Sequence, residues 1–222
     1  SDWSSDVCSS DLTIFHSLSL QGDQAKHSIR QNEIVLSTIH GIKACARTKY
    51  LINHRVHLRF EISNIDAIGM VEQLLENRII DQLSFMDHTP GQGQYRDIEL
   101  HKRFLMEHRN MSEKDVERLF AEKSNRLKVN EQTLQRLADL AKKQRIPLAS
   151  HDDDSIEKIA LVKEWGADIS EFPVALNVAI AAKKAELHVV MGAPNVLLER
   201  SHSNNLSALE AIEQGVVDIL CS

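Results

Sequence analysis

From residue 13 to residue 221 the chain alternates between short apolar, β-rich runs and longer segments with helical spacing of apolar residues. This alternation predicts a parallel sheet whose strands are joined by crossover helices. Seven strands are predicted, at Thr13–Leu18, Arg55–Ile62, Gln82–His88, Ile146–His151, Ile169–Phe172, Leu187–Met191 and Val216–Cys221. Helices are predicted between them, at Ser28–Arg47, Ile65–Arg78, Asn130–Arg145, Ser155–Trp165, Val174–Ala185 and Asn205–Gln214. The fold class is therefore α/β, a partial (β/α)8 TIM-like barrel that lacks one strand of the closed form.

The second predicted strand, Arg55–Ile62, alternates strictly between apolar and polar side chains. Its apolar residues share one face, whereas His57, Arg59 and Glu61 share the other. In a barrel the apolar face contacts the helices, so the polar residues line the interior. Glu61 then lies towards the carboxyl end of the strand, where barrel enzymes carry their catalytic groups. A buried carboxylate needs a compensating partner, and either a neighbouring arginine or a metal ion would serve.

The next two predicted strands both end in histidine, at His88 and His151. Because the carboxyl ends of parallel strands meet at one edge of a sheet, we expect these imidazoles to converge with Glu61. A single histidine at a strand end is more often structural, but two at equivalent positions beside an inward carboxylate favour a metal site. Two imidazoles and a carboxylate suit zinc, manganese or iron, and a shared carboxylate can bridge two ions.

Two acidic residues, Asp152 and Asp153, directly follow His151. We expect one of them to orient a ligand histidine from outside the coordination sphere, and direct metal ligation is the alternative. Asp154 or Ser155 is expected to cap the helix that follows.

Residues 191–205, MGAPNVLLERSHSNN, join a strand end to a loop rich in small and polar residues. Such a loop can bind phosphate or phosphonate oxygens through backbone amides and a cationic side chain. The candidate substrate-binding residues are Asn195, Arg200, His202 and Ser203. An ordinary polar loop before the next helix is the alternative interpretation.

About forty residues separate the third predicted strand from the helix that is predicted before the fourth strand. This is far more than a typical barrel loop contains. Within them, Ser112 and the EKDVERLF that follows it read as a capped amphipathic helix. We therefore predict a helical insertion at about 91–129. It is either a lid over the barrel mouth or a surface decoration.

Composition limits the class of protein and its partners. With 42% hydrophobic and 26% charged residues, 13–222 is expected to be one globular domain. The net charge of −6 gives no basic surface for nucleic acid. Cys8, Cys45 and Cys221 have no paired spacing, and no membrane-spanning run or secretory signal is evident. The sequence thus predicts a cytoplasmic protein with no nucleic-acid or membrane partner, and leaves open a homo-oligomer.

Residues 1–12, SDWSSDVCSSDL, have no helical or strand period. A DNA sequence that resembles a common short-read sequencing adapter translates into residues 2–11 followed by Leu12. We therefore interpret this segment as non-native, which would place the natural N-terminus upstream. A natural disordered tail is the alternative.

Several segments occur in an order that is typical of one known family. They are HLRFE, SFMDHTPGQGQY, ASHDDDS, SEFPV, VVMGAPNVLLERSHSNN and GVVDILCS. Together they resemble the diphosphatases of the bacterial carbon–phosphorus lyase pathway, within the amidohydrolase superfamily. The similarity extends over nearly all of 13–222, and DHTPGQ, ASHDD and MGAPN with SHS are its most specific motifs.

The resemblance implies a metal-dependent barrel that removes pyrophosphate from a phosphorylated ribose phosphonate, a ribose 1-methylphosphonate 5-triphosphate. By position, His88 and His151 match strand-end histidine ligands of the superfamily, and Glu61 matches a bridging carboxylate of some members. One or two divalent ions, zinc or manganese, are expected. Metal-bound water would be the nucleophile, and Arg200 or His202 would stabilise the leaving pyrophosphate.

The chain departs from this family at both ends. The first barrel strand, with its paired metal ligands, would precede residue 13, and the aspartate that usually acts as general base would follow Ser222. We therefore expect a fragment with little or no activity, although its parent would be an enzyme. We also expect exposed sheet edges that favour aggregation.

Two other functions remain open. The ligands alone do not distinguish a phosphoanhydride hydrolase from a deacetylase or a cyclic-amide hydrolase on the same barrel. A non-catalytic barrel could also bind phosphorylated ligands and keep Glu61, His88 and His151 as a buried polar network.

Overall fold

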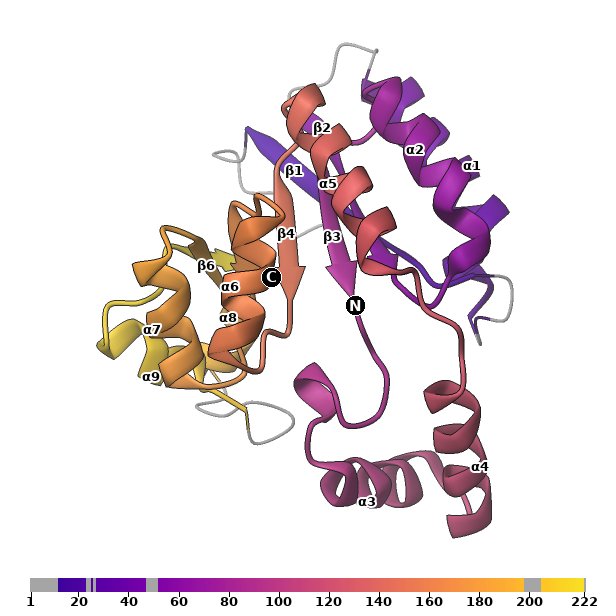
Figure 1. The fold of residues 1–222 in the computed structure, drawn as a ribbon, viewed down its shortest axis with the longest axis vertical. Coiled ribbons are helices and arrows are strands. Elements are labelled where there is room, and N and C mark those ends of the chain that lie inside the picture. The colour runs from indigo at the N-terminus through magenta and orange to yellow at the C-terminus, as the bar shows by residue number, and fades with distance from the viewer. Residues whose placement is uncertain (1–11, 23–24, 26, 47–51, 198–204, 222) are drawn as a thin grey trace.

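Seven parallel strands form one sheet that curls into a half-barrel with helices interleaved between the strands (Figure 1). The computed structural model describes residues 12–22, 25, 27–46, 52–197 and 205–221. The strands lie in sequence order and are β1 (Thr13–Leu20), β2 (Asn53–Glu61), β3 (Gln82–Met86), β4 (Leu148–His151), β5 (Ile169–Glu171), β6 (His188–Gly192) and β7 (Ile219–Cys221). The predicted class, a partial α/β barrel of the TIM-like type, is confirmed.

Helices connect the strands, as the spacing of apolar residues predicts. They are α1 (Asn32–Ala46), α2 (Ile68–Glu76), α5 (Glu131–Gln144), α6 (Ile156–Glu164), α7 (Leu176–Lys184) and α9 (Ala208–Glu213), with short turns η2 (Ser28–Arg30) and η3 (Ile65–Ala67) before α1 and α2. Two of the helices begin at side-chain caps, because Asn130 accepts a hydrogen bond from the Thr133 amide and Ser155 accepts one from the Lys158 amide. Within the described ranges no helix combines the length and apolarity needed to cross a bilayer.

The main core lies between the outer face of the sheet and these helices. Val56, Leu58 and Phe60 of β2 are fully buried there, in one cluster with Val35 and Ile39 of α1. The polar residues of β2 point to the opposite, interior face. There they contact a side chain of β3, a side chain of β4 and His88, which follows β3. The alternation of apolar and polar residues therefore predicts correctly which side chains reach the mouth of the barrel.

Strand β3 ends at Met86, two residues before His88, so the prediction that this histidine closes the strand is wrong. The cause is a local turn at Asp87. Its Oδ1 atom accepts hydrogen bonds from the backbone amide and the hydroxyl of Thr89, which directs the chain out of the sheet. His151, by contrast, is the last residue of β4, as predicted.

The long segment between β3 and β4 contains the turn η4 (Gly93–Tyr95) and two helices, α3 (Ile98–Arg109) and α4 (Glu113–Ser124). Figure 1 shows α3 and α4 beyond the arrowhead of β3, at the carboxyl end of the sheet. The pair has a small core of its own, formed by Leu105, Val116 and Phe120. Ser112 caps helix α4, as predicted, because its side chain accepts a hydrogen bond from the Asp115 amide, whereas α3 was not predicted as a separate helix.

Residues 1–11 of the adapter-like segment lie outside the described structure, and so do Arg200, His202 and Ser203. Their interpretation stays a prediction.

Candidate metal centre

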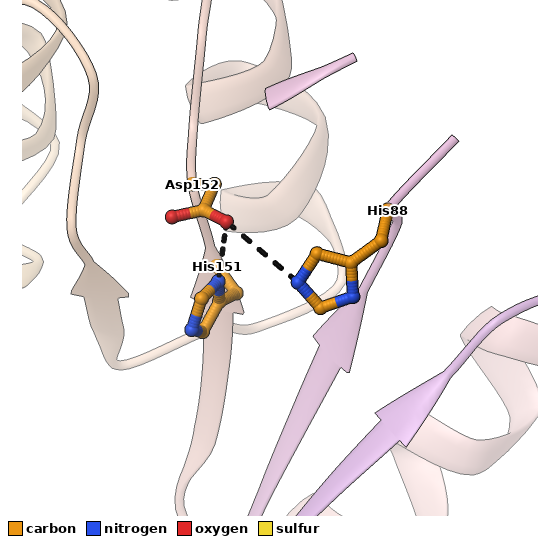
Figure 2. Close-up of side chains that lie close together, drawn as sticks. All are labelled: His88, His151 and Asp152. Carbon is orange, nitrogen blue, oxygen red and sulfur yellow. Dashed lines mark ion pairs between the residues drawn. The ribbon is translucent and has the colours of Figure 1, made fainter. Parts of the chain in front are cut away.

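Three side chains converge at the carboxyl ends of β3 and β4. His88, His151 and Asp152 each offer one ligand atom, and these atoms all lie within 4.8 Å of one another. In Figure 2 both imidazoles face the same carboxylate oxygen. Asp152 Oδ2 lies 2.9 Å from His151 Nδ1 and 4.0 Å from His88 Nε2. Two imidazole nitrogens and a carboxylate oxygen suit zinc and similar divalent ions, so the residues present fit a metal ion.

Asp152 reaches this position through an unusual backbone conformation. Its φ angle is 52°, in the left-handed region that aspartate tolerates better than most residues. Its amide donates to the carbonyl of Glu171, which fixes the turn after β4. Burial tends to raise the pKa of Asp152, but the charges of His151, His88 and Lys158 bring it below the ordinary value. The carboxylate is therefore ionised at neutral pH, as a metal ligand must be.

Glu61 lies behind His88 and outside the three-residue cluster. Its Oε2 atom is 2.5 Å from His88 Nδ1, and its Oε1 atom accepts a hydrogen bond from the His88 amide at 3.0 Å. With Nδ1 engaged by the carboxylate, the other ring nitrogen faces Asp152. This is the arrangement in which a carboxylate orients a metal-binding histidine. Glu61 therefore contacts His88 from outside the cluster, and Asp152 lies within it, which fits the alternative that one of the two aspartates ligates a metal directly. The role of each residue towards a metal stays a prediction.

Arg59 lies against the outer nitrogen of His151, with the guanidinium Nη2 2.5 Å from His151 Nε2. Arginine only donates hydrogen bonds, so this ring nitrogen accepts, and a neutral ring carries its proton on Nδ1. The Nδ1 atom is buried beside Asp152 without the geometry of a hydrogen bond. A metal ion on His151 would therefore require Arg59 to leave Nε2, because a neutral ring offers only one lone pair at a time.

A second polar network fills the barrel interior. The Glu171 carboxylate accepts hydrogen bonds from Ser84 Oγ at 2.9 Å and from Gln82 Nε2 at 3.1 Å, and lies 3.6 Å from His57 Nε2. Burial lowers the pKa of His57 to about 4; Glu171 opposes this shift, whereas Arg59 and His151 add to it. Sequence reasoning missed Glu171, although it ends β5 as His151 ends β4.

Asp153 is completely buried and holds β4 to β5. Its Oδ2 atom accepts hydrogen bonds from the hydroxyls of Ser150 and Ser170, both at 2.5 Å. The ammonium of Lys158 lies 3.5 Å from Oδ1. These contacts give Asp153 a structural role beneath the candidate metal centre.

A cavity of about 270 Å³ opens beside the cluster. Its wall includes Arg59, His151, Asp152 and Asn195. Asn195 lies on α8 (Ala193–Leu197), a short helix where a loop was predicted. Of the predicted substrate-binding residues, the structure thus brings Asn195 to the candidate site. A larger cavity of about 480 Å³ lies elsewhere, among Leu134, Leu148 and Trp165 of the outer layer, and contains none of the three cluster residues.

Fold and site together define a class, an α/β barrel segment with a histidine and carboxylate cluster at the carboxyl ends of its strands. No protein-family profile matches the chain. The chain is similar to alpha-D-ribose 1-methylphosphonate 5-triphosphate diphosphatase of Escherichia coli (strain K12), with 31% identity over 170 residues. The matched region is 76% of this chain and 45% of the relative, so the chain spans less than half the length of that protein. The resemblance inferred from the motifs is confirmed at this level of similarity.

Proposed function

We propose that this chain forms part of a metal-dependent diphosphatase that acts on a phosphorylated ribose phosphonate. The observation that carries the proposal is the convergence of His88, His151 and Asp152 at the mouth of an α/β barrel. The similarity to a diphosphatase supports a phosphoanhydride as the bond that is cleaved.

His88, His151 and Asp152 would hold the metal ion, zinc or manganese, and Glu61 would keep the His88 ring in place. Three protein ligands are typical of catalytic zinc sites, which keep a further position open. When bound, the ion would polarise a phosphoryl group and lower the pKa of water. A second ion, bridged by a carboxylate, remains part of the proposal.

The protein's own polar groups would bind and orient the substrate. Asn195 lines the cavity next to His151 and Asp152, so its amide can donate to a phosphate or phosphonate oxygen. We keep Arg200, His202 and Ser203 as proposed phosphate ligands, because they follow Asn195 in the same polar segment. Charge on the leaving pyrophosphate would require such cationic groups.

Metal binding is the first test. We expect the 222-residue chain to bind about one zinc or manganese ion, measured by calorimetric titration and elemental analysis. His88→Ala and His151→Ala should each weaken binding by at least about tenfold, since each removes one ligand. His40→Ala, at an exposed position of α1, is the matched control. Unchanged affinity in both site variants would contradict the proposal.

Turnover is the second test, with pyrophosphate release from the ribose phosphonate triphosphate as the readout and the Escherichia coli relative as the active reference. That this chain alone has little or no activity stays a prediction, and turnover equal to that of the relative would contradict it. Hydrolysis of an N-acyl sugar instead would favour the deacetylase alternative. A protein that binds the triphosphate but binds no metal ion would favour the non-catalytic alternative.

A further inference from the structure

Arg59 extends from β2 into the barrel interior, where its guanidinium contacts a residue of the candidate metal centre. Its Nη2 atom donates a hydrogen bond to His151 Nε2 at 2.5 Å. Arg59 forms no ion pair with any carboxylate that the structure describes, whereas Arg55 on the same strand pairs with Asp81 at 2.8 Å. The positive charge of Arg59 therefore lies against an imidazole nitrogen and has no bonded counterion.

Arg59 also lines the cavity of about 270 Å³ beside the metal centre. This volume is close to the lower end of those that hold small-molecule ligands, which begin at about 300 Å³. The other polar residues of the wall are Gln94, His151, Asp152, Asn195 and Asn205. The cavity thus combines a cationic group, an anionic group and side-chain amides that can donate hydrogen bonds to an anion.

The contact between Arg59 and His151 is incompatible with a metal ion on the same ring. A neutral imidazole has one lone pair, and Arg59 uses it by donating to Nε2. The other nitrogen, Nδ1, lies 2.9 Å from Asp152 Oδ2. It can bind a cation only when the ring proton is on Nε2, and that N–H would then face the N–H groups of Arg59. Whichever nitrogen binds the ion, Arg59 has to leave Nε2.

A guanidinium that leaves Nε2 needs another acceptor. Arg59 is half-buried, and a donor left without an acceptor there costs free energy. It would also lie near the positive charge of the ion. A tetrahedral anion in the cavity would remove both costs, because it can accept two hydrogen bonds from the guanidinium and is attracted by both charges. Without the ion, the same anion meets the Asp152 carboxylate on the cavity wall. Each ligand therefore favours the binding of the other.

We infer that Arg59 couples the candidate metal centre to an anion-binding subsite in this cavity, which takes a tetrahedral dianion such as a phosphate or phosphonate group. Without ligands, Arg59 occupies the lone pair of His151 and weakens metal binding. When the anion binds, Arg59 turns towards it and releases His151. Metal ion and anion then raise each other's affinity by the same factor. The inference rests on the proposed function for the metal site, and adds that the phosphorylated substrate itself tightens that site.

Calorimetric titration of zinc into the full chain, with and without sulfate at constant ionic strength, tests this inference. Sulfate is the probe because it is a tetrahedral dianion. It should raise the zinc affinity of the wild type by about fivefold or more, the lower end of the usual range of coupling between two sites. In Arg59→Met the zinc affinity should change by less than about twofold when sulfate is added, because the coupling residue is lost. Arg55→Met is the matched control and should keep the full sulfate effect, since Arg55 pairs with Asp81 at the other end of β2.

Thermal unfolding establishes that each variant is folded. Arg59→Lys keeps the test decisive if Arg59→Met does not fold, because lysine retains the charge but lacks the planar fork of donors. Its sulfate effect should be smaller than that of the wild type. A wild type that binds zinc without any response to sulfate, or an equal response in the wild type and the folded Arg59 variants, would overturn the inference and leave the proposed function standing. A chain that binds no zinc, with or without sulfate, would refute the proposed metal site and this coupling with it.

Discussion

Glu61 contacts both the ring and the backbone of His88. Its substitution therefore tests most directly whether a carboxylate holds the His88 ring in position to bind a metal ion. Glu61→Gln keeps the shape but removes the negative charge that supports the imidazole. We expect zinc affinity to fall by about 10-fold to 100-fold, the usual effect of losing a carboxylate behind a ligand histidine. Calorimetric titration of zinc measures this directly.

The control is Glu99→Gln, which changes an exposed carboxylate of α3. It should leave zinc affinity unchanged. If Glu61→Gln binds zinc as the wild type does, while its melting temperature is also unchanged, Glu61 does not position His88.

Arg59 gives the opposite expectation. Its guanidinium lies on His151 Nε2 and adds positive charge beside the cluster. Arg59→Met should therefore raise zinc affinity, by about tenfold, because it frees the ring and removes a repulsive charge. Arg55→Met is a control on the same strand, since Arg55 pairs with Asp81 at the other end of β2. A lower zinc affinity in Arg59→Met would instead make Arg59 part of the binding site.

The sequence predicted which residues lie in the barrel interior, but not every position within the site. Alternation in β2 placed Glu61 and Arg59 inside the barrel, and histidines after consecutive strands indicated a shared site. That Asp152 lies within the cluster while Glu61 lies outside it could not be predicted, because these positions depend on the left-handed backbone of Asp152 and the turn at Asp87. Both are local conformations that hydrophobic spacing does not encode.

Strands β4 and β5 are joined by the side chain of Asp153 as well as by the sheet. Asp153→Ala would leave the hydroxyls of Ser150 and Ser170 without their common acceptor in a buried space. We expect the free energy of unfolding to fall by about 2–4 kcal/mol, measured by denaturant titration. Asp139→Ala, at an exposed position of α5, should have little effect. Equal losses in the two variants would show that the buried hydrogen bonds contribute nothing specific.

Strands and helices with a clear apolar period were predicted well, because the burial of one face determines where such an element forms. All the strands of the sheet and the six crossover helices lie close to their predicted ranges. The elements that were missed, α3 and α8, have weaker patterns. Helix α3 buries only His101 and Leu105, and α8 has no fully buried residue. Helix α3 depends on its Asp97 cap and on contacts with α4, which become visible only in three dimensions.

The whole sheet has two open edges in the described structure, at β1 and β7. Phe15 is 50% exposed on β1, and Leu220 is 48% exposed on β7. Unpaired strand edges with apolar side chains favour association between chains. Aggregation of this chain stays a prediction. That expectation depends on the whole sheet, because it is the strand order that leaves β1 and β7 each without a neighbour on one side.

The response of the molecule to acid depends on histidines that fold into the protein in their neutral form. His57 is 5% exposed and has a pKa of about 4, against an ordinary value of 6.5. Between these pH values the unfolded chain binds a proton that the folded chain does not, so stability falls as pH decreases. For His57 this loss should amount to about 3 kcal/mol by the time the pH reaches 4.

Denaturant unfolding at several pH values between 7 and 4 measures this effect. His101 also has a pKa of about 4 and changes stability in the same direction, so the wild-type loss includes both residues. His57→Gln should therefore show a smaller loss across the same pH range, even if its stability at pH 7 is lower because contacts with Ser84 and Glu171 change. His40→Gln, on the surface of α1, should keep the full wild-type dependence. The same pH dependence in His57→Gln and in the wild type would contradict this prediction. It would mean that the interior network takes up the proton without loss of folding free energy, although His57 is buried.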